Sequence, residues 1–391
     1  MNYKILARKW RPKNFSEIIG QKYIIKALSN SINFKKIHQA WLFSGSRGTG
    51  KTTIARILAK NLCCEKGITI ASCEKCSICK EIEKGNFVDL IEIDAASKTK
   101  IEEIKKILEN IKYAPIKSRF KIYLIDEVHM LSRYSFNALL KTLEEPPKHI
   151  KFILATTEIE KIPKTIISRC IIFYLKKINK ENIILNLKKI LTQENINIEK
   201  KALNIIAENS QGSMRDALNL LELSINISKK KIKKKNIIKI LGRIDEKECL
   251  KLLISILIND KKRIIFLLNK ISLENIEWDK ILIEMLRLLH HIAMIQSFKS
   301  LWNNKNYLNK KKYIIKKLSK YVPKKIIQKC YKIITIGYKK IHLSPSPRLG
   351  MEITLLKILY IIHYKNKKKY IKMKKKIKKK IIIKKKKKKK T

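Results

Sequence analysis

The sequence of 391 residues lacks any long apolar stretch that could cross a membrane. No run of about 18 uncharged apolar residues occurs, and even the apolar segment 351–364 contains Glu352 and Lys357. The first 13 residues, MNYKILARKWRPK, lack the apolar core of a signal peptide. We therefore expect no membrane association and a cytoplasmic location.

The eight cysteines lack the distribution of a disulfide framework, because five of them fall within Cys63–Cys79 and the other three are single. This pattern is typical of a reduced intracellular protein with one local cysteine site. The composition also excludes wholesale disorder, since 45% of the residues are apolar.

Acidic residues are scarce: 32 Asp and Glu stand against 90 Lys and Arg, a formal net charge of +58. Residues 365–391 contain 18 of the lysines and no acid. An excess of this size suggests a polyanionic partner such as nucleic acid. Compositional drift in an A+T-rich genome explains it equally well, because Lys, Ile and Asn are over-used everywhere. Charge alone therefore assigns no function.

Apolar runs that alternate with helical patterns predict an α/β fold over residues 1–178. The runs show little polar alternation, as in strands that are buried on both faces. The predicted strands of one parallel sheet are Ala40–Phe43, Val88–Asp94, Lys121–Ile125, Phe152–Thr156 and Ile171–Leu175. Helices are expected over residues 101–111 and 135–145, and Pro146 and Pro147 end the second one.

The rest of the chain has helical patterns without strand signals. We expect a small helical domain over residues 179–242 and a larger all-helical domain over residues 243–364. Residues 365–391 are a low-complexity Lys/Ile tail, and such a composition cannot form a packed core.

Residues 45–52, GSRGTGKT, match the phosphate-binding motif G-x-x-x-x-G-K-[ST] in full. They follow the apolar strand AWLF and open the helix TTIARILAKNL, which is the context that the motif requires. Glycines let backbone N–H groups approach phosphates, Lys51 offers a charge to the β- and γ-phosphates, and Thr52 offers its hydroxyl to Mg²⁺. The predicted nucleotide-binding residues are Gly45, Ser46, Arg47, Gly48, Thr49, Gly50, Lys51 and Thr52.

A second strand end, KIYLIDEVH, provides the carboxylates that such a loop needs. Asp126 is expected to hold Mg²⁺, directly or through water, and Glu127 to polarise the attacking water as general base. An Asp-Glu pair alone often only caps a helix, but the upstream phosphate loop favours the hydrolytic interpretation. His129 is expected to pack or hydrogen-bond at the strand end rather than to react.

These motifs lie within longer runs that resemble AAA+ ATPases, and among them the gamma/tau subunit family of the bacterial DNA polymerase III clamp loader. The resemblance covers roughly residues 3–360. The runs that carry it are LARKWRPKNFSEIIGQ (6–21), GSRGTGKTTIARILAKNL (45–62), DLIEIDAAS (89–97), YLIDEVHMLSRYSFNALLKTLEEPP (123–147), FILATTE (152–158), ISRC (167–170) and GSMRDAL (212–218), together with the cysteine run. The resemblance implies an AAA+ P-loop ATPase domain with a zinc module, then a helical lid and a helical collar domain for oligomerisation.

The resemblance also implies roles that the residues alone do not reveal. Thr157 matches a sensor that hydrogen-bonds the γ-phosphate or the lytic water, although by itself it is an ordinary strand end. Arg169 matches the arginine that acts in trans on ATP held by the neighbouring subunit. Arg215 matches a second sensor, on a helix that Ser213 and Asp216 are expected to begin as a capping box. Candidate contacts to the base are Ala7, Ile19 and Met214.

The cysteine run reads C-x8-C-x2-C-x2-C from residue 64, a spacing that suits tetrahedral Zn²⁺ in a closed, structural site. The resemblance agrees, because gamma/tau subunits carry a zinc module after the P-loop helix, and it selects Cys64 over the adjacent Cys63. Disulfides and an iron–sulfur cluster are the competing interpretations. The predicted zinc ligands are Cys64, Cys73, Cys76 and Cys79. The isolated Cys249 and Cys330 are expected in the core.

The family resemblance implies an ATPase that is a subunit of the DNA polymerase III holoenzyme and loads the sliding clamp onto primed DNA, with ATP, Mg²⁺ and structural Zn²⁺. The implied partners are delta-like and delta-prime-like subunits, further copies of this chain, the sliding clamp, primer–template DNA and, through accessory subunits, single-stranded DNA-binding protein. Longer family members continue into segments that contact the replicative helicase and the polymerase subunit. Here a lysine-rich run follows instead, so we expect the short, clamp-loading form.

Two other functions fit parts of the pattern. A DNA helicase or branch-migration motor would share the ATPase motifs, but the four-cysteine run and the SRC run argue against it. An ATP-binding scaffold without hydrolysis is a further alternative. The intact set of Lys51, Asp126 and Glu127 argues against the scaffold.

Overall fold

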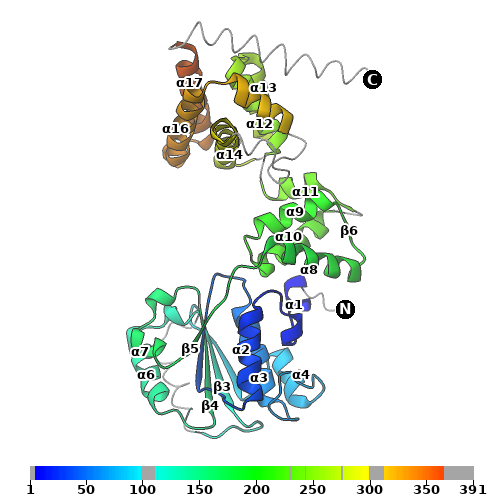
Figure 1. Cartoon of the computed structure of the whole chain (residues 1–391), viewed down its shortest axis with the longest axis vertical. Helices are drawn as coiled ribbons and strands as arrows, with labels where there is room; N and C mark the ends of the chain where they lie inside the picture. Colours follow the sequence, from blue (N-terminus) through cyan, green and yellow to red (C-terminus); the bar gives the residue numbers. More distant parts are fainter. Residues whose placement is uncertain are drawn as a thin grey trace. The chain divides into compact units, whose positions relative to one another are not determined.

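The computed structural model (Figure 1) has two compact units, Met1–Lys234 and Lys235–Thr391. It describes residues 5–97, 111, 113–228, 231–242, 244–273, 276–298 and 312–364. The helix predicted over residues 101–111 lies outside the described residues except for Ile111, which is buried, and the Lys/Ile tail lies outside them as well. None of the helices in these ranges is long and apolar enough to span a membrane.

The first unit is built on the predicted five-stranded parallel sheet, whose order is β2-β3-β4-β1-β5. All five strand predictions are confirmed within two residues. The strands are β1 (Ala40–Ser44), β2 (Leu90–Asp94), β3 (Lys121–Asp126), β4 (Ile150–Thr156) and β5 (Ile171–Tyr174). Ser44 pairs with Thr156, and Asp94 pairs with Asp126. The carboxyl ends of four strands therefore meet at one edge.

Both faces of the sheet are covered, which explains the near-continuous apolar runs in the strands. Trp41 and Phe43 pack into one core with α2 (Lys22–Asn33), α3 (Lys51–Cys63) and α4 (Ser77–Lys84). Figure 1 shows these three helices on one side of the sheet. Ala40 and Leu42 point to the other face, against α6 (Arg133–Glu144) and α7 (Lys164–Ile167). Each fully buried large side chain contributes about 1.5–3 kcal/mol relative to exposure.

Strands β2 and β4 and helix α6 each begin two residues from the predicted start, and at β2 and α6 the reason is a polar side chain that binds backbone amides. Strand β2 begins at Leu90 rather than Val88, since the buried carboxylate of Asp89 accepts hydrogen bonds from the amides of residues 116, 117 and 118 at 2.7–2.9 Å. Helix α6 begins two residues early, because Ser132 caps it. Its other end, at Glu144, agrees with the prediction to one residue.

The remainder of the first unit is mainly helical, with α1 (Leu6–Lys9), α8 (Lys180–Gln193), α9 (Lys200–Asn209) and α10 (Met214–Ile227). The short α1 packs on α10, and the Leu6 amide donates to Glu222 Oε2 at 3.2 Å. Two unpredicted strands of two residues each, β6 (Asn197–Ile198) and β7 (Lys231–Ile232), form a parallel pair. Two residues are too few to produce a period-2 signal. Helix α11 (Lys234–Ile240) follows.

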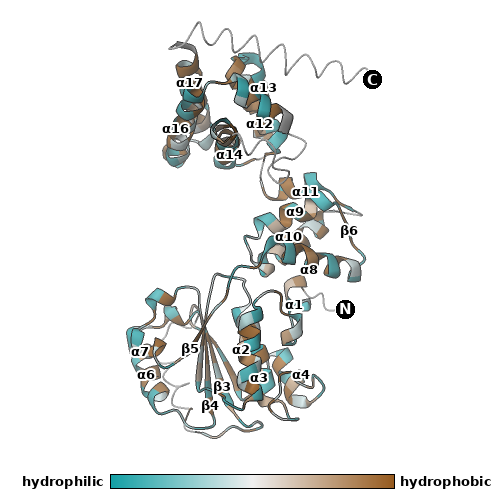
Figure 2. Cartoon of the chain, in the orientation of Figure 1, coloured by the Kyte–Doolittle hydropathy of each residue, from teal (hydrophilic) through white to brown (hydrophobic). Residues whose placement is uncertain are grey.

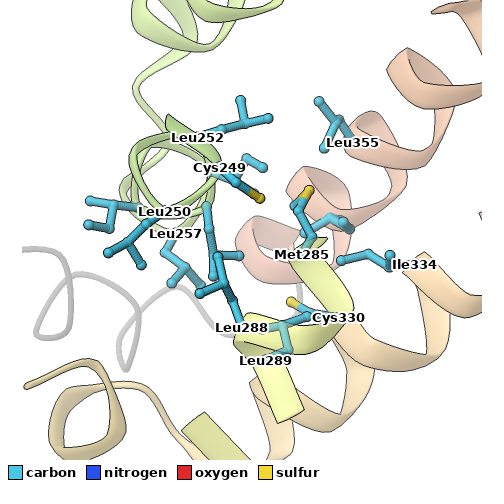
Figure 3. Packing of buried hydrophobic residues seen from close by; sticks show 14 of the residues in the cluster. Cys249, Leu250, Leu252, Leu257, Met285, Leu288, Leu289, Cys330, Ile334 and Leu355 are labelled. Atoms are coloured by element: carbon cyan, nitrogen blue, oxygen red, sulfur yellow. The ribbon is translucent and has the colours of Figure 1, made fainter. Parts of the chain in front are cut away.

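The second unit is all-helical in its described part. Its helices are α12 (Glu246–Ile258), α13 (Lys261–Leu273), α14 (Trp278–Ser297), α15 (Lys312–Tyr321), α16 (Lys324–Lys340) and α17 (Pro347–Tyr364). Figure 3 shows Met285 of α14 within a core that α12, α16 and α17 complete. Cys249 and Cys330 lie in this core, as predicted. In Figure 2 these helices carry both apolar and polar residues along their length.

Candidate nucleotide site and cysteine cluster

The predicted phosphate loop connects β1 to α3 at the carboxyl edge of the sheet. Gly48 and Gly50 have φ values of +75° and +103°, a backbone region that residues other than glycine rarely adopt. A Cβ on Gly48 would lie 1.9 Å from Ser213 Oγ. The Thr49 hydroxyl donates to Ser46 O at 2.7 Å and holds the loop together, while Arg47 is exposed. The loop therefore has the close backbone approach that phosphate binding needs.

The two predicted halves of the nucleotide site lie in contact. The Thr52 hydroxyl donates to Asp126 Oδ2 at 2.6 Å, although the residues are 74 positions apart. Lys51 Nζ donates to Gly45 O at 2.9 Å and Ser46 O at 3.3 Å. Burial lowers the pKa of Lys51, and the nearby carboxylates only partly oppose this. A desolvated cation beside paired hydroxyl and carboxylate oxygens fits a nucleotide with Mg²⁺, whose preferred ligands are oxygens.

The predicted general base and the predicted sensor are hydrogen-bonded to each other. Glu127 Oε2 accepts from the Thr157 amide at 3.1 Å and from the Thr157 hydroxyl at 2.9 Å. Glu127 has a φ of +49°, and its amide donates to Asp126 Oδ1 at 3.0 Å. This turn directs the two successive carboxylates to different partners.

His129 lies beside this pair and hydrogen-bonds at the end of β4, as predicted. Its Nδ1 is 3.0 Å from Thr156 Oγ1 and 3.5 Å from Glu127 Oε2. Its Nε2 is 3.7 Å from Glu158 Oε1. The imidazole is 5% exposed, so it belongs to the buried wall of the site.

The start of α10 lies at the phosphate loop, because a Cβ on Gly48 would lie 3.5 Å from Arg215 Cβ. Only half of the predicted capping box forms: Ser213 Oγ accepts from the Asp216 amide at 3.2 Å, but the Ser213 amide donates to Ser210 O. The backbone turn at Ser210 occupies the donor that a capping box would use. The candidate base contacts Ala7, Ile19 and Met214 are all partly buried.

Arg11 is a site residue that sequence reasoning missed. Its Nε donates to Thr53 Oγ1 at 3.2 Å, next to the predicted magnesium ligand Thr52. Burial and the neighbouring Arg56 lower the pKa of Arg11 to about 10, and Arg215 acts in the same direction. The available signal was its place in the run KWRPK, within the first stretch that resembles the family.

Arg169 lies away from the residues above. Its guanidinium bonds Glu144 Oε1 and Thr165 O, each at 2.7 Å. It precedes β5, and Ile171 pairs with Trp41 near the start of β1, whereas the phosphate loop follows the end of β1. At about 3.3 Å per strand residue, the two ends of β1 lie roughly 15 Å apart. Arg169 is thus near the opposite edge of the sheet from Thr52.

The four predicted cysteine ligands form one cluster, and all four Sγ atoms lie within 4.8 Å of one another. Cys73 Sγ and Cys79 Sγ are 3.9 Å apart, close to the roughly 3.8 Å expected for two thiolates on tetrahedral Zn²⁺. Backbone amides lower the pKa of Cys73 to about 6, whereas burial raises that of Cys79. Cys63 is outside the cluster and contacts Ser118 Oγ instead. The cluster fits zinc.

Three protein families match successive parts of the chain. Residues 20–179 match the family described as "DNA polymerase III, delta subunit". Residues 182–230 match "DNA polymerase III clamp loader subunit, ATPase lid domain". Residues 232–373 match "DNA polymerase III subunits gamma and tau domain III".

Individual proteins match over most of the chain. The DNA polymerase III subunit gamma of Buchnera aphidicola subsp. Schizaphis graminum is 57% identical, over 92% of this chain and 99% of that protein. The DNA polymerase III subunit tau of Escherichia coli K12 is 47% identical, over 92% of this chain and 56% of that protein. Among solved structures, the RuvB Holliday junction branch migration motor of Thermotoga maritima is 22% identical over 63% of this chain and 79% of its own, with a TM-score of 0.46.

Proposed function

Because the chain belongs to the family of gamma and tau subunits of DNA polymerase III, it is an ATPase subunit of the replicative clamp loader, and we propose that its nucleotide site drives the loading of the sliding clamp onto primed DNA. The contact between Thr52 and Asp126 carries this proposal. It joins a phosphate loop to a carboxylate strand end, the pairing that nucleotide hydrolysis requires.

Each site residue has a distinct role in this proposal. Residues 45–52 bind the phosphates through backbone amides and the Lys51 ammonium, while Thr52 and Asp126 offer oxygens to Mg²⁺. Bound ATP with Mg²⁺ supplies the phosphoanhydride bond that water cleaves. Glu127 accepts the proton of the attacking water. Thr157 and Arg215 sense the bound nucleotide.

Hydrolysis is completed by a neighbouring subunit. Arg169 precedes β5 beside the start of β1, and its own phosphate loop follows the other end of β1, roughly 15 Å along the strand, which supports action in trans. A guanidinium that enters a site only when an interface closes stabilises transition-state charge there and couples hydrolysis to assembly. ATP energy then drives a conformational change, and the DNA itself undergoes no covalent reaction.

A stripe of exposed apolar side chains on α17 supports assembly with related subunits. Leu349, Ile353, Leu356 and Tyr360 recur at helical spacing and are 45–64% exposed. With Ile333 of α16 and two neighbours, part of this stripe lines a shallow groove of about 360 Å³. A second helical collar domain, from a delta-like or delta-prime-like subunit or another copy of the chain, would bury this stripe.

The cysteine cluster is proposed to bind one structural Zn²⁺ ion. Four thiolates fill a tetrahedral shell and leave no position for a substrate or water. Amides of Cys73, Cys76 and Cys79 approach neighbouring sulfurs at 3.4–3.5 Å, and such donors stabilise thiolates. The ion would hold the segment that follows the P-loop helix.

ATPase stimulation in a reconstituted loader tests the function. Hydrolysis should require the sliding clamp together with primer–template DNA for full rate, and no unwinding of forked DNA should accompany it. The control is a loader reconstituted with a Glu127→Gln chain, which should bind ATP but show no stimulation. Processive unwinding of the fork, or hydrolysis indifferent to the clamp, would instead indicate a helicase or branch-migration motor.

A further inference from the structure

A buried histidine links the proposed general base to the proposed sensor. His129 comes three residues after β3, and Thr156 is the last residue of β4 and is fully buried. His129 Nδ1 is 3.0 Å from Thr156 Oγ1, which also accepts from the Glu158 amide at 3.0 Å. Thr157, the next residue, donates twice to Glu127. His129 is thus hydrogen-bonded to Thr156 and Thr157 to Glu127, and the two pairs are joined through the end of β4.

We propose that His129 is a positioning residue for ATP hydrolysis: through Thr156 it fixes the end of β4, so that Thr157 holds the Glu127 carboxylate in place. The inference rests on the proposed ATPase site and adds a residue to it. Glu127 itself follows a left-handed turn at φ +49°, so neighbouring side chains must determine its orientation. Thr157 provides two of those contacts, and its own position depends on the strand end that His129 contacts.

Only one edge of the imidazole is close enough to fix the strand. The Nδ1 edge is within hydrogen-bond distance of Thr156, whereas Nε2 is 3.7 Å from Glu158 Oε1. An Asn side chain places an amide near the position of Nδ1, and a Gln side chain places one near Nε2. An amide can donate or accept, so His129→Asn preserves the contact whichever nitrogen of the imidazole carries the proton.

The test compares three variants at His129 for hydrolysis, nucleotide affinity and thermal unfolding in the reconstituted loader. His129→Ala and His129→Gln should lower kcat by about 10²-fold, the effect of displacing a reacting group by about 1 Å. Their KM for ATP, their affinity for a fluorescent ATP analogue and their Tm should stay close to the unmutated values. His129→Asn should recover most of kcat.

A second pair of variants tests the same contact from the other side. Thr156→Val removes the hydroxyl and should lower kcat as His129→Ala does, whereas Thr156→Ser should keep it. Because each change removes the contact between His129 and Thr156, the double variant of Thr156→Val with His129→Ala should lose little more than Thr156→Val alone, which also removes the acceptor for the Glu158 amide.

Several results would overturn the inference. Unchanged kcat in His129→Ala, equal activity of the Asn and Gln variants, or additive losses in the double variant would each do so. A joint fall in kcat, nucleotide affinity and Tm would show that His129 only supports the fold. If the unmutated chain hydrolyses ATP at a rate that the clamp does not change, the proposed clamp-loading function is refuted. The His129 variants still test the inference in that case, because their kcat is compared with that of the unmutated chain.

Discussion

The substitution Arg169→Ala tests whether hydrolysis requires an arginine from the neighbouring subunit or takes place within a single chain. Arg169 lies near the amino-terminal edge of the sheet and Thr52 at the carboxyl edge, roughly 15 Å along β1. An extended arginine side chain cannot bridge this distance within one chain and still contact a phosphate. The substitution should therefore leave ATP binding by the isolated chain nearly unchanged.

The two effects of the substitution differ greatly in size. Within the chain, Arg169 loses an ion pair with Glu144 in which the side chains are 33% and 52% exposed, and such pairs contribute up to about 1 kcal/mol. Across an interface, an arginine finger contributes about 10³-fold or more to the hydrolysis rate, which is about 4 kcal/mol of transition-state stabilisation. Clamp- and DNA-stimulated hydrolysis should fall by about 10³-fold while Tm moves little.

Mixed assembly gives the sharpest assay. Arg169→Ala chains and Glu127→Gln chains are each deficient alone, but some mixed interfaces join an intact Glu127 site to an intact Arg169 of the neighbour. Hydrolysis should therefore recover partly in mixtures whose assembly is verified by size-exclusion chromatography. Glu144→Gln is the control, since it breaks the ion pair and keeps the arginine. No recovery at any mixing ratio would refute action in trans.

Three further predictions concern binding, metal and assembly. Lys51→Ala should abolish binding of a fluorescent ATP analogue because it removes the desolvated phosphate-facing cation, and unmutated affinity would contradict this. Freshly purified, reduced protein should contain about one zinc per chain by elemental analysis. Cys76→Ser should lose the zinc and Cys63→Ser should keep it, while metal-free protein would exclude a zinc site. Leu356→Glu should prevent assembly with partner subunits in size-exclusion chromatography, whereas Lys262→Glu on α13 should not, and equal assembly of both would exclude the α17 stripe as the interface.

The sheet could be predicted because its strands are buried on both faces. Residues such as Phe152 and Ile153 are both fully buried although they point to opposite faces, so the strand appears in the sequence as an uninterrupted apolar run. The phosphate loop could be predicted for a different reason. Its glycines allow the backbone to adopt the conformation of the loop, and Lys51 supplies a positive charge. Both requirements demand those residue types at fixed spacing.

Contacts between distant segments could not be predicted in the same way. Nothing in the local pattern indicates that Thr157 donates to Glu127, or that Arg11 lies at Thr53, because each contact depends on how separate elements pack. The pattern placed Asp89 in the predicted strand Val88–Asp94, but its carboxylate binds three amides from a segment 27–29 residues away and the strand begins after it. The family resemblance supplied Thr157, whereas Arg11 required the structure.

The position of the cysteine cluster suggests why a structural ion would matter to a nucleotide site. Cys64 follows the last residue of α3 and Cys76 caps α4, with its Sγ accepting from the Cys79 amide at 3.4 Å. Helix α3 begins at Lys51, and in the proposed site the amino-terminal end of this helix binds the phosphates of the nucleotide. A zinc ion would join the far end of this helix to α4 and close the loop between them, which reduces the freedom of the unfolded segment. Loss of zinc should therefore loosen the helix that presents Lys51 and Thr52, even though the ion touches neither residue.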